Sequence, residues 1–151
     1  MGPLIQELVL KGQGRLYEQD FFLAATTTQP QTFEPAANFV WIFYEFDLEP
    51  HDINLSLQLT GPNIAGNATL RSLGRPLEGA YLAIPGGPLN ATMNNNTDSG
   101  AVITFRYVEL TAYWYAKLMN PAYAGETAAW THVLNQANTM PGAPAAKGGG
   151  R

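Results

Sequence analysis

The chain has 151 residues, of which 46% are hydrophobic and 11% aromatic, so it can fold as one domain and a disordered chain is excluded. Only 13% of the residues are charged, against about 25% in ordinary soluble domains. Uncharged Thr, Asn and Gln must therefore cover much of the surface, and they cost less to desolvate than ions when neighbouring molecules cover it. The net charge of −4 and the scattered Lys and Arg residues disfavour nucleic-acid binding.

The N-terminal part begins with a short apolar segment, residues 4–10, which we assign to an arm or first strand within residues 1–12. The folded domain is expected over residues 13–139. Its first strand is predicted at residues 15–25, where apolar and polar residues roughly alternate. Residues 26–37 contain two prolines and a Thr/Gln cluster, which indicate a loop.

The strongest β segment covers residues 39–49. Its first half is apolar at every position, as in a strand that is buried on both faces. Its second half alternates, with apolar Tyr44, Phe46 and Leu48 against acidic Glu45, Asp47 and Glu49. The strand is therefore predicted to run from a covered region to a solvated rim.

Residues 53–60 give the clearest strand pattern in the chain. Ile53 and three leucines alternate strictly with four polar residues, and a helix would scatter these apolar side chains around its axis. The pattern predicts a half-buried strand, which Gly61 and Pro62 end.

Shorter strands are predicted at residues 68–73 and 80–84, and a polar loop at 90–100. Residues 102–118 are long and aromatic, which indicates one bent strand or two strands joined near a bulge at 109–112. With about seven to nine strands, the fold class is all-β, an antiparallel β-sandwich or jelly-roll-like barrel.

One short C-terminal helix is predicted at residues 126–138, which lack Gly and Pro and repeat apolar residues at helical spacing. Residues 140–151 have the Gly, Pro and Ala content of a linker and form the C-terminal tail. With 1–12 as the arm and 13–139 as the β-sandwich domain, this completes the predicted organisation.

An acidic group is the first candidate for chemistry. Glu45, Asp47 and Glu49 should share one face of a strand, about 7 Å apart, with His51 and Asp52 in the next turn. Carboxylates at this spacing can flank a scissile bond or hold Ca²⁺. The favoured interpretation is a solvated rim whose like charges discourage pairing with another sheet edge. No metal site is predicted.

Nucleophilic catalysis needs a serine beside a base. Ser56, Ser72 and Ser99 lie outside any Gly-x-Ser-x-Gly sequence, and the two histidines are His51 and His132. The glycine runs lack the Lys and Ser or Thr of a phosphate-binding loop. We therefore predict no enzyme, no catalytic residues and no cofactor.

Aromatic residues on a β surface can bind sugars, and Tyr113, Trp114 and Tyr115 are the candidates for such a surface. In a strand Tyr113 and Tyr115 would share one face and Trp114 the other. Packing in a core or an interface is the favoured interpretation. The sequence also has no cysteine, no signal-peptide pattern and no run of about 18 apolar residues that could cross a membrane.

The chain resembles small virion shell proteins in having no cysteine, few charges, an apolar arm at 4–10, strands at 39–49, 53–60 and 102–118, and a tail from 141. It is similar in these features to the single-jelly-roll capsid proteins of tailless, internal-membrane phages such as those of Thermus. The decoration proteins that cement tailed-phage heads share the same features. The resemblance rests on no diagnostic motif.

Such a resemblance implies a structural protein of the virion whose partners are copies of itself and other shell proteins. The shell would lie near a viral membrane without spanning it. The prediction is a bacteriophage capsid subunit, with a decoration protein as the first alternative. A carbohydrate-binding module, or a small hydrolase using the rim of Glu45, Asp47 and Glu49, are alternatives from other classes.

Overall fold

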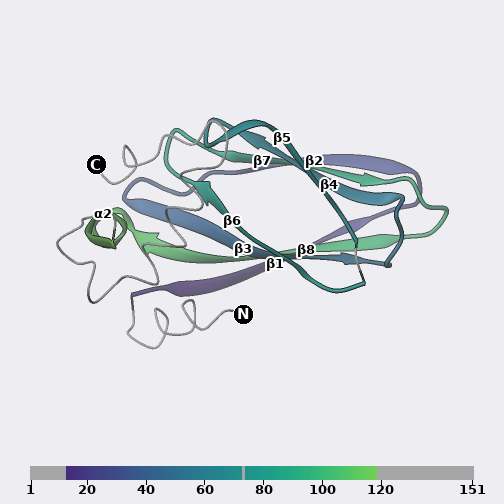
Figure 1. Ribbon diagram of the computed structural model, residues 1–151, viewed down its shortest axis with the longest axis horizontal. Helices are drawn as coiled ribbons and strands as arrows, with labels where there is room; N and C mark the ends of the chain where they lie inside the picture. The colour runs from purple at the N-terminus through teal and green to yellow at the C-terminus, as the bar shows by residue number, and fades with distance from the viewer. Residues whose placement is uncertain (1–12, 73, 119–151) are drawn as a thin grey trace.

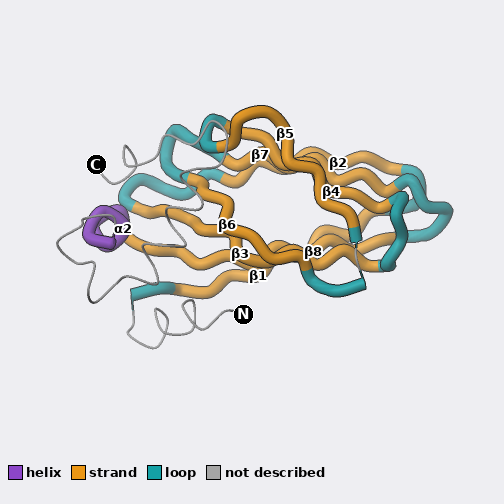
Figure 2. Tube along the Cα trace, viewed as in Figure 1, coloured by secondary structure: helices purple, strands orange, loops and turns teal. Residues whose placement is uncertain are grey.

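The computed structural model describes residues 13–72 and 74–118. In this part of the chain, eight strands form two antiparallel sheets that pack face to face, and a short helix lies at one end (Figures 1 and 2). The predicted all-β sandwich is therefore confirmed. The arm at 1–12, the helix at 126–138 and the tail at 140–151 lie outside the described residues.

Each sheet has four strands. Sheet I contains, in spatial order, β1 (Arg15–Leu23), β8 (Ala101–Thr111), β3 (Phe39–Glu49) and β6 (Leu77–Ala83). Sheet II contains β2 (Thr27–Phe33), β7 (Leu89–Asn95), β4 (Leu55–Gly61) and β5 (Ile64–Arg71). Every connection except the β4–β5 hairpin crosses from one sheet to the other, which is the wrapped connectivity of an eight-stranded jelly roll.

The inner faces of both sheets form the main core. In β4, Leu55, Leu57 and Leu59 are fully buried, which confirms the predicted alternation. Ile53, the first residue of that pattern, is 70% exposed and precedes the strand. Because successive residues of a strand point to opposite faces, the intervening polar residues lie on the outer face of sheet II.

Phe33, at the end of β2, joins the two sheets. Its ring lies 4.9 Å from that of Phe43 and 4.8 Å from that of Phe105, centroid to centroid, and both partners belong to sheet I. Phe21 and Tyr107, also in sheet I, surround the same ring at 6.0 and 6.3 Å. One side chain of sheet II is thus packed into an aromatic cluster of the opposite sheet.

A bulge divides β3 into two parts. Phe43 and Glu45 pair with consecutive residues of β8, Tyr107 and Arg106, so Tyr44 is the extra residue. Before the bulge, outward Val40 and Ile42 belong to a second apolar cluster on the outer face of sheet I, as the prediction of a strand buried on both faces requires. The other members of that cluster are Ala80, Leu82, Ile84, Val108, Leu110 and Tyr115.

After the bulge, Phe46 and Leu48 point into the main core while Glu45 and Asp47 point outward, so the predicted change from covered region to polar rim is confirmed. The assignment of Tyr44 to the face of Phe46 was wrong. Tyr44 packs against the outer cluster, because the bulge shifts the alternation by one residue.

Two strands lie where loops were predicted. β2 falls within residues 26–37, and β7 covers residue 89 and the first half of the predicted loop at 90–100; the two strands pair with each other along their whole length. Pro30 is tolerated because β2 is an edge strand, where a proline can turn its missing N–H side away from the ladder. The inward residues of β7 are Leu89, Ala91, Met93 and Asn95, so its three apolar residues stand among four Asn and Thr residues.

The end of the aromatic segment 102–118 also differs from the prediction. β8 stops at Thr111, and residues Ala112–Leu118 form helix α2 instead of further strand. The Thr111 hydroxyl accepts a hydrogen bond from the backbone N–H of Trp114 at 3.1 Å, which is the N-cap arrangement that starts a helix.

Candidate assembly surfaces

The outer face of sheet II is almost free of charge. Its residues form rows across the four strands, in which hydrogen-bonded neighbours follow the strand register. One row is Thr28, Asn94, Ser56 and Arg71; the next is Pro30, Thr92, Gln58 and Thr69; the third is Thr32, Asn90 and Thr60. Arg71 is the charged residue in these rows. We call this surface the uncharged face.

Side-chain hydrogen bonds order part of the uncharged face. The hydroxyl of Thr28 donates to Oδ1 of Asn94 at 3.1 Å, and that of Thr32 donates to Oδ1 of Asn90 at 2.9 Å. These polar groups are already paired with each other, and none of the four is ionised. Covering this face therefore costs less desolvation free energy than covering a charged surface.

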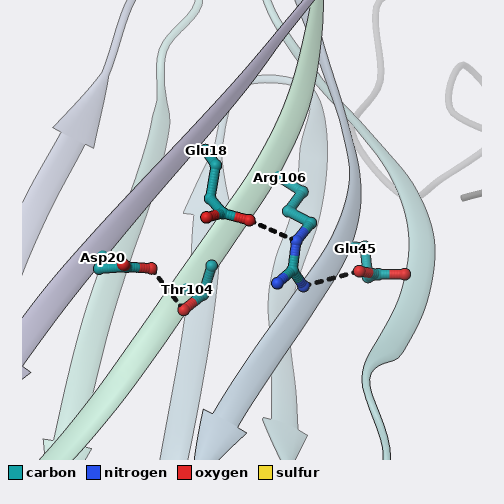
Figure 3. A network of polar contacts seen from close by, with 5 residues as sticks. All are labelled: Glu18, Asp20, Glu45, Thr104 and Arg106. Atoms are coloured by element: carbon teal, nitrogen blue, oxygen red, sulfur yellow. Dashed lines mark hydrogen bonds and ion pairs between the residues drawn. The ribbon is translucent and has the colours of Figure 1, made fainter.

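The outer face of sheet I is charged beyond the bulge. In one row Glu18, Arg106, Glu45 and Glu78 stand side by side across all four strands. In the next row Asp20 lies opposite Thr104, which lies opposite Asp47. Figure 3 shows Glu18 and Glu45 pointing toward Arg106 from its two sides. We call these two rows the acidic band.

Arg106 holds the acidic band together. Its Nε donates to Glu18 at 2.8 Å, and its Nη1 donates to Glu45 at 2.7 Å (Figure 3). Burial would lower the pKa of Arg106, but the hydrogen bond and charge of Glu18 and then those of Glu45 outweigh it, so this pKa is raised. The hydroxyl of Thr104 donates to Asp20 at 2.6 Å. Most carboxylates of the band therefore have a partner within sheet I.

The acidic residues considered for metal or acid–base chemistry have separate surroundings. Glu45 binds Arg106, and Asp52 accepts a hydrogen bond from the backbone N–H of Asn54 at 2.8 Å, which forms a turn. Within residues 13–72 and 74–118, no three His, Asp or Glu side chains gather as metal ligands. The arrangement is that of a polar rim stabilised by ion pairs.

The structure brings Ser72 together with two residues at and just after the end of β3, Glu49 and His51. His51 Nδ1 lies 2.9 Å from Ser72 Oγ, and His51 Nε2 lies 3.3 Å from Glu49 Oε1. This is the residue set of an acid–His–Ser triad, but the two ring nitrogens have exchanged partners relative to the serine-protease arrangement. The side chains of His51 and Glu49 are 43% and 52% exposed. Because these side chains are exposed to solvent, the contacts add little stability, and they connect the end of β3 with the end of β5.

The sequence placed Glu49 and His51 in one candidate group but did not connect them with Ser72, because 21 positions separate His51 from Ser72. The ends of β3 and β5, which belong to different sheets, lie close together here, and a local sequence pattern cannot predict this contact. The remaining serines, Ser56 and Ser99, lie on β4 and in the loop before β8. His132 lies outside the described residues.

The aromatic residues considered for sugar binding do not share a face. Tyr113 is 71% exposed and Tyr115 is fully buried, because both lie on helix α2 rather than on a strand. Tyr115 and Trp114 pack against the outer apolar cluster of sheet I. The prediction that Tyr113 and Tyr115 point the same way was therefore wrong, and these two residues do not form a sugar platform.

No protein-family model matches the sequence, and no curated protein matches it. Among solved structures, the chain is similar to a de novo designed double-stranded β-helix determined by solution NMR, with 12% identity and a TM-score of 0.36. The match covers 60% of this chain and 97% of the designed chain. Among the described residues, no helix has the length and apolar character needed to span a membrane.

Proposed function

We propose that the protein is a bacteriophage structural protein, a capsid subunit that assembles a virion shell through self-association. The observation that carries the proposal is the uncharged face of sheet II. A four-strand-wide surface with one charged residue suits burial between subunits better than permanent contact with water.

The strand order supports the same proposal by analogy. Eight-stranded jelly rolls of two facing sheets occur in viral capsid proteins, and also in lectins and cupins. Because one fold serves several functions, this support concerns the class of architecture only. The absence of cysteine adds a physical argument, since a chain without disulfides gains stability by mass action when its copies associate.

The test is self-association of the full chain, measured by native mass spectrometry over a range of concentrations. The expected result is a population of oligomers that grows with concentration. Thr92→Lys places a charge at the centre of the uncharged face and is expected to reduce the formation of oligomers larger than a dimer at least about tenfold, because the ammonium group must be desolvated. Thr26→Lys, in the exposed turn between β1 and β2, is the matched control.

Two outcomes contradict the proposal. One is a protein that stays monomeric at high micromolar concentration. The other is a population of oligomers larger than a dimer that Thr92→Lys leaves unchanged while circular dichroism shows that both variants are folded.

A further inference from the structure

One edge of sheet I is formed by β1 (Figure 1), and the other by β6. The residues of β1 pair with β8 on one side, and within the described residues no strand pairs with its other side. A free strand edge presents a row of backbone N–H and C=O groups that can bind another strand. Among the four edge strands, β1 also carries exposed apolar side chains, Phe22 at 75% and Leu16 at 36% exposed.

The other edge strands contain residues that oppose pairing. β2 contains Pro30, and a proline cannot donate a hydrogen bond to an added strand. β5 and β6 each contain a glycine in mid-strand, and these weaken pairing. A Cβ atom at Gly79 of β6 would lie 2.5 Å from the ring of Tyr81, so this glycine cannot be replaced without movement. β1 has neither proline nor glycine.

Residues 16–22 of β1 are symmetric in residue class about the central residue, Gln19, whereas the end residues Arg15 and Leu23 differ in class. Moving outward from Gln19, the two neighbours are acids, Glu18 and Asp20. The next two are aromatic, Tyr17 and Phe21, and the next two are the exposed apolar residues Leu16 and Phe22. A two-fold axis through Gln19 would therefore place each class opposite its own kind in an antiparallel pair.

We propose that β1 pairs with β1 of a second copy of this chain, antiparallel and centred on Gln19, which joins the two copies of sheet I into one continuous eight-stranded sheet. This inference rests on the proposed self-association and names one contact that produces it. All nine residues of β1 pair in this register, along about 30 Å of strand.

Other registers that keep the same residues outward give less favourable cross-strand pairs. A shift by two residues in one direction places Glu18 opposite Glu18 and the exposed Leu16 opposite Asp20. A shift in the other direction places Asp20 opposite Asp20 and Phe22 opposite Glu18. The register centred on Gln19 covers both exposed apolar residues with each other and gives two Tyr17–Phe21 pairs on the inner side.

The cost of this register is that Glu18 lies opposite Asp20 of the second copy. Both carboxylates already lean over sheet I, where Glu18 binds Arg106 and Asp20 accepts the hydroxyl hydrogen of Thr104 (Figure 3). Some repulsion remains, because the band carries more acids than Arg106 can neutralise. The contact should therefore become tighter when this repulsion is reduced, by salt or by removal of one charge.

A cysteine cross-link gives the direct test, since the chain has no cysteine of its own. Residues directly opposite in an antiparallel pair have Cα atoms about 4.5 to 5.5 Å apart, within the disulfide range. Gln19→Cys should form a covalent dimer under mild oxidation. Gln31→Cys, on edge strand β2, is the matched control and should stay largely monomeric.

The dissociation constant of the dimer is measured by sedimentation velocity on the wild-type chain and on variants that contain no cysteine. Phe22→Thr should weaken the dimer about tenfold, because the two-fold axis repeats the lost Leu16–Phe22 pair. Ile53→Thr removes an apolar side chain that is 70% exposed and lies away from β1, and it should have no effect on the dimer. Asp20→Asn, and salt raised from about 10 to 150 mM, should each tighten the dimer about threefold.

The inference is overturned if Gln19→Cys gives no more covalent dimer than Gln31→Cys, or if Asp20→Asn weakens association. If self-association persists in either case, the proposed function stands and another surface carries the contact. If the wild-type chain is monomeric at every concentration, both fail.

Discussion

The outer faces of the two sheets satisfy their polar groups in different ways. On sheet II, uncharged Thr and Asn side chains hydrogen-bond to each other across β2 and β7. On sheet I, carboxylates from β1 and β3 converge on Arg106 of β8. The few charges of this chain are thus concentrated on sheet I, where most of them are paired, and Arg71 is the charged residue in the rows of the uncharged face. The inner faces, by contrast, form one shared core.

The largest effect is expected where the two sheets share that core. Phe33→Ala removes a side chain that is 2% exposed and surrounded by sheet I aromatics, and it should lower the free energy of unfolding by about 3 to 5 kcal/mol. Urea unfolding measures this loss. Phe22→Ala, at a 75% exposed position, should change it by less than about 0.5 kcal/mol in dilute solution. Equal losses would contradict the shared core.

Arg106→Ala should remove both ion pairs of the acidic band and destabilise the protein more than a change on the uncharged face does. It leaves Glu18 and Glu45 facing each other without the cation between them, and Glu45 is only 13% exposed. We expect a loss of about 1 to 2 kcal/mol in urea unfolding. Arg71→Ala on the uncharged face removes one hydrogen bond to the carbonyl of Ile53 and should cost less than about 1 kcal/mol. Similar losses of unfolding free energy for Arg106→Ala and Arg71→Ala would contradict this difference between the two outer faces.

Alkaline pH should weaken sheet I in particular. Burial raises the pKa values of Tyr44, Tyr81 and Tyr107, which lie on its strands, whereas the strands of sheet II contain no tyrosine. A raised pKa in the folded state favours the protonated phenol. The resulting stability is complete below pH of about 10, where tyrosine in the unfolded chain ionises, and is lost as pH rises through the folded-state pKa.

The measurement is the free energy of unfolding between pH 8 and 11, followed in parallel by phenolate absorbance. Tyr107→Phe should flatten the decline, since it removes one group that ionises more readily in the unfolded chain. An unchanged slope in this variant would show that Tyr107 does not contribute to it.

The smallest effect is expected on the uncharged face. Thr28→Val and Thr32→Val each remove one exposed hydroxyl hydrogen bond to a β7 asparagine while keeping β-branched shape. Each should lower the free energy of unfolding by less than about 0.5 kcal/mol. A larger loss in urea unfolding would mean that these hydrogen bonds, and not the inner core, hold β2 in place.

The sequence predicted the strands whose apolar pattern is strong. Phe39–Glu49 was placed at its observed bounds, and the leucines of β4 point inward as their alternation requires. β2 and β7 were missed because their stability comes from pairing and from a few inward residues such as Phe33 and Met93, which local composition hides. Helix α2 was missed because aromatic residues favour strands, although Thr111 gave a capping signal.

The candidate surfaces could be predicted only in part. The outward position of Glu45 and Asp47 followed from alternation, but their partner did not, because Arg106 lies 61 positions from Glu45. The same limit applies to His51 and Ser72. Scarcity of charge predicted an uncharged surface somewhere on the molecule, and the strand order assigns it to sheet II.

The bulge at Tyr44 also has a consequence for how the length of this strand can vary. Because Tyr44 has no residue opposite it on β8, deleting it would leave Phe43 inward, Glu45 outward and Phe46 inward. Deleting a neighbour such as Phe46 or Leu48 would instead turn every later residue to the opposite face. Position 44 is therefore a place where β3 can lose a residue without losing its pattern.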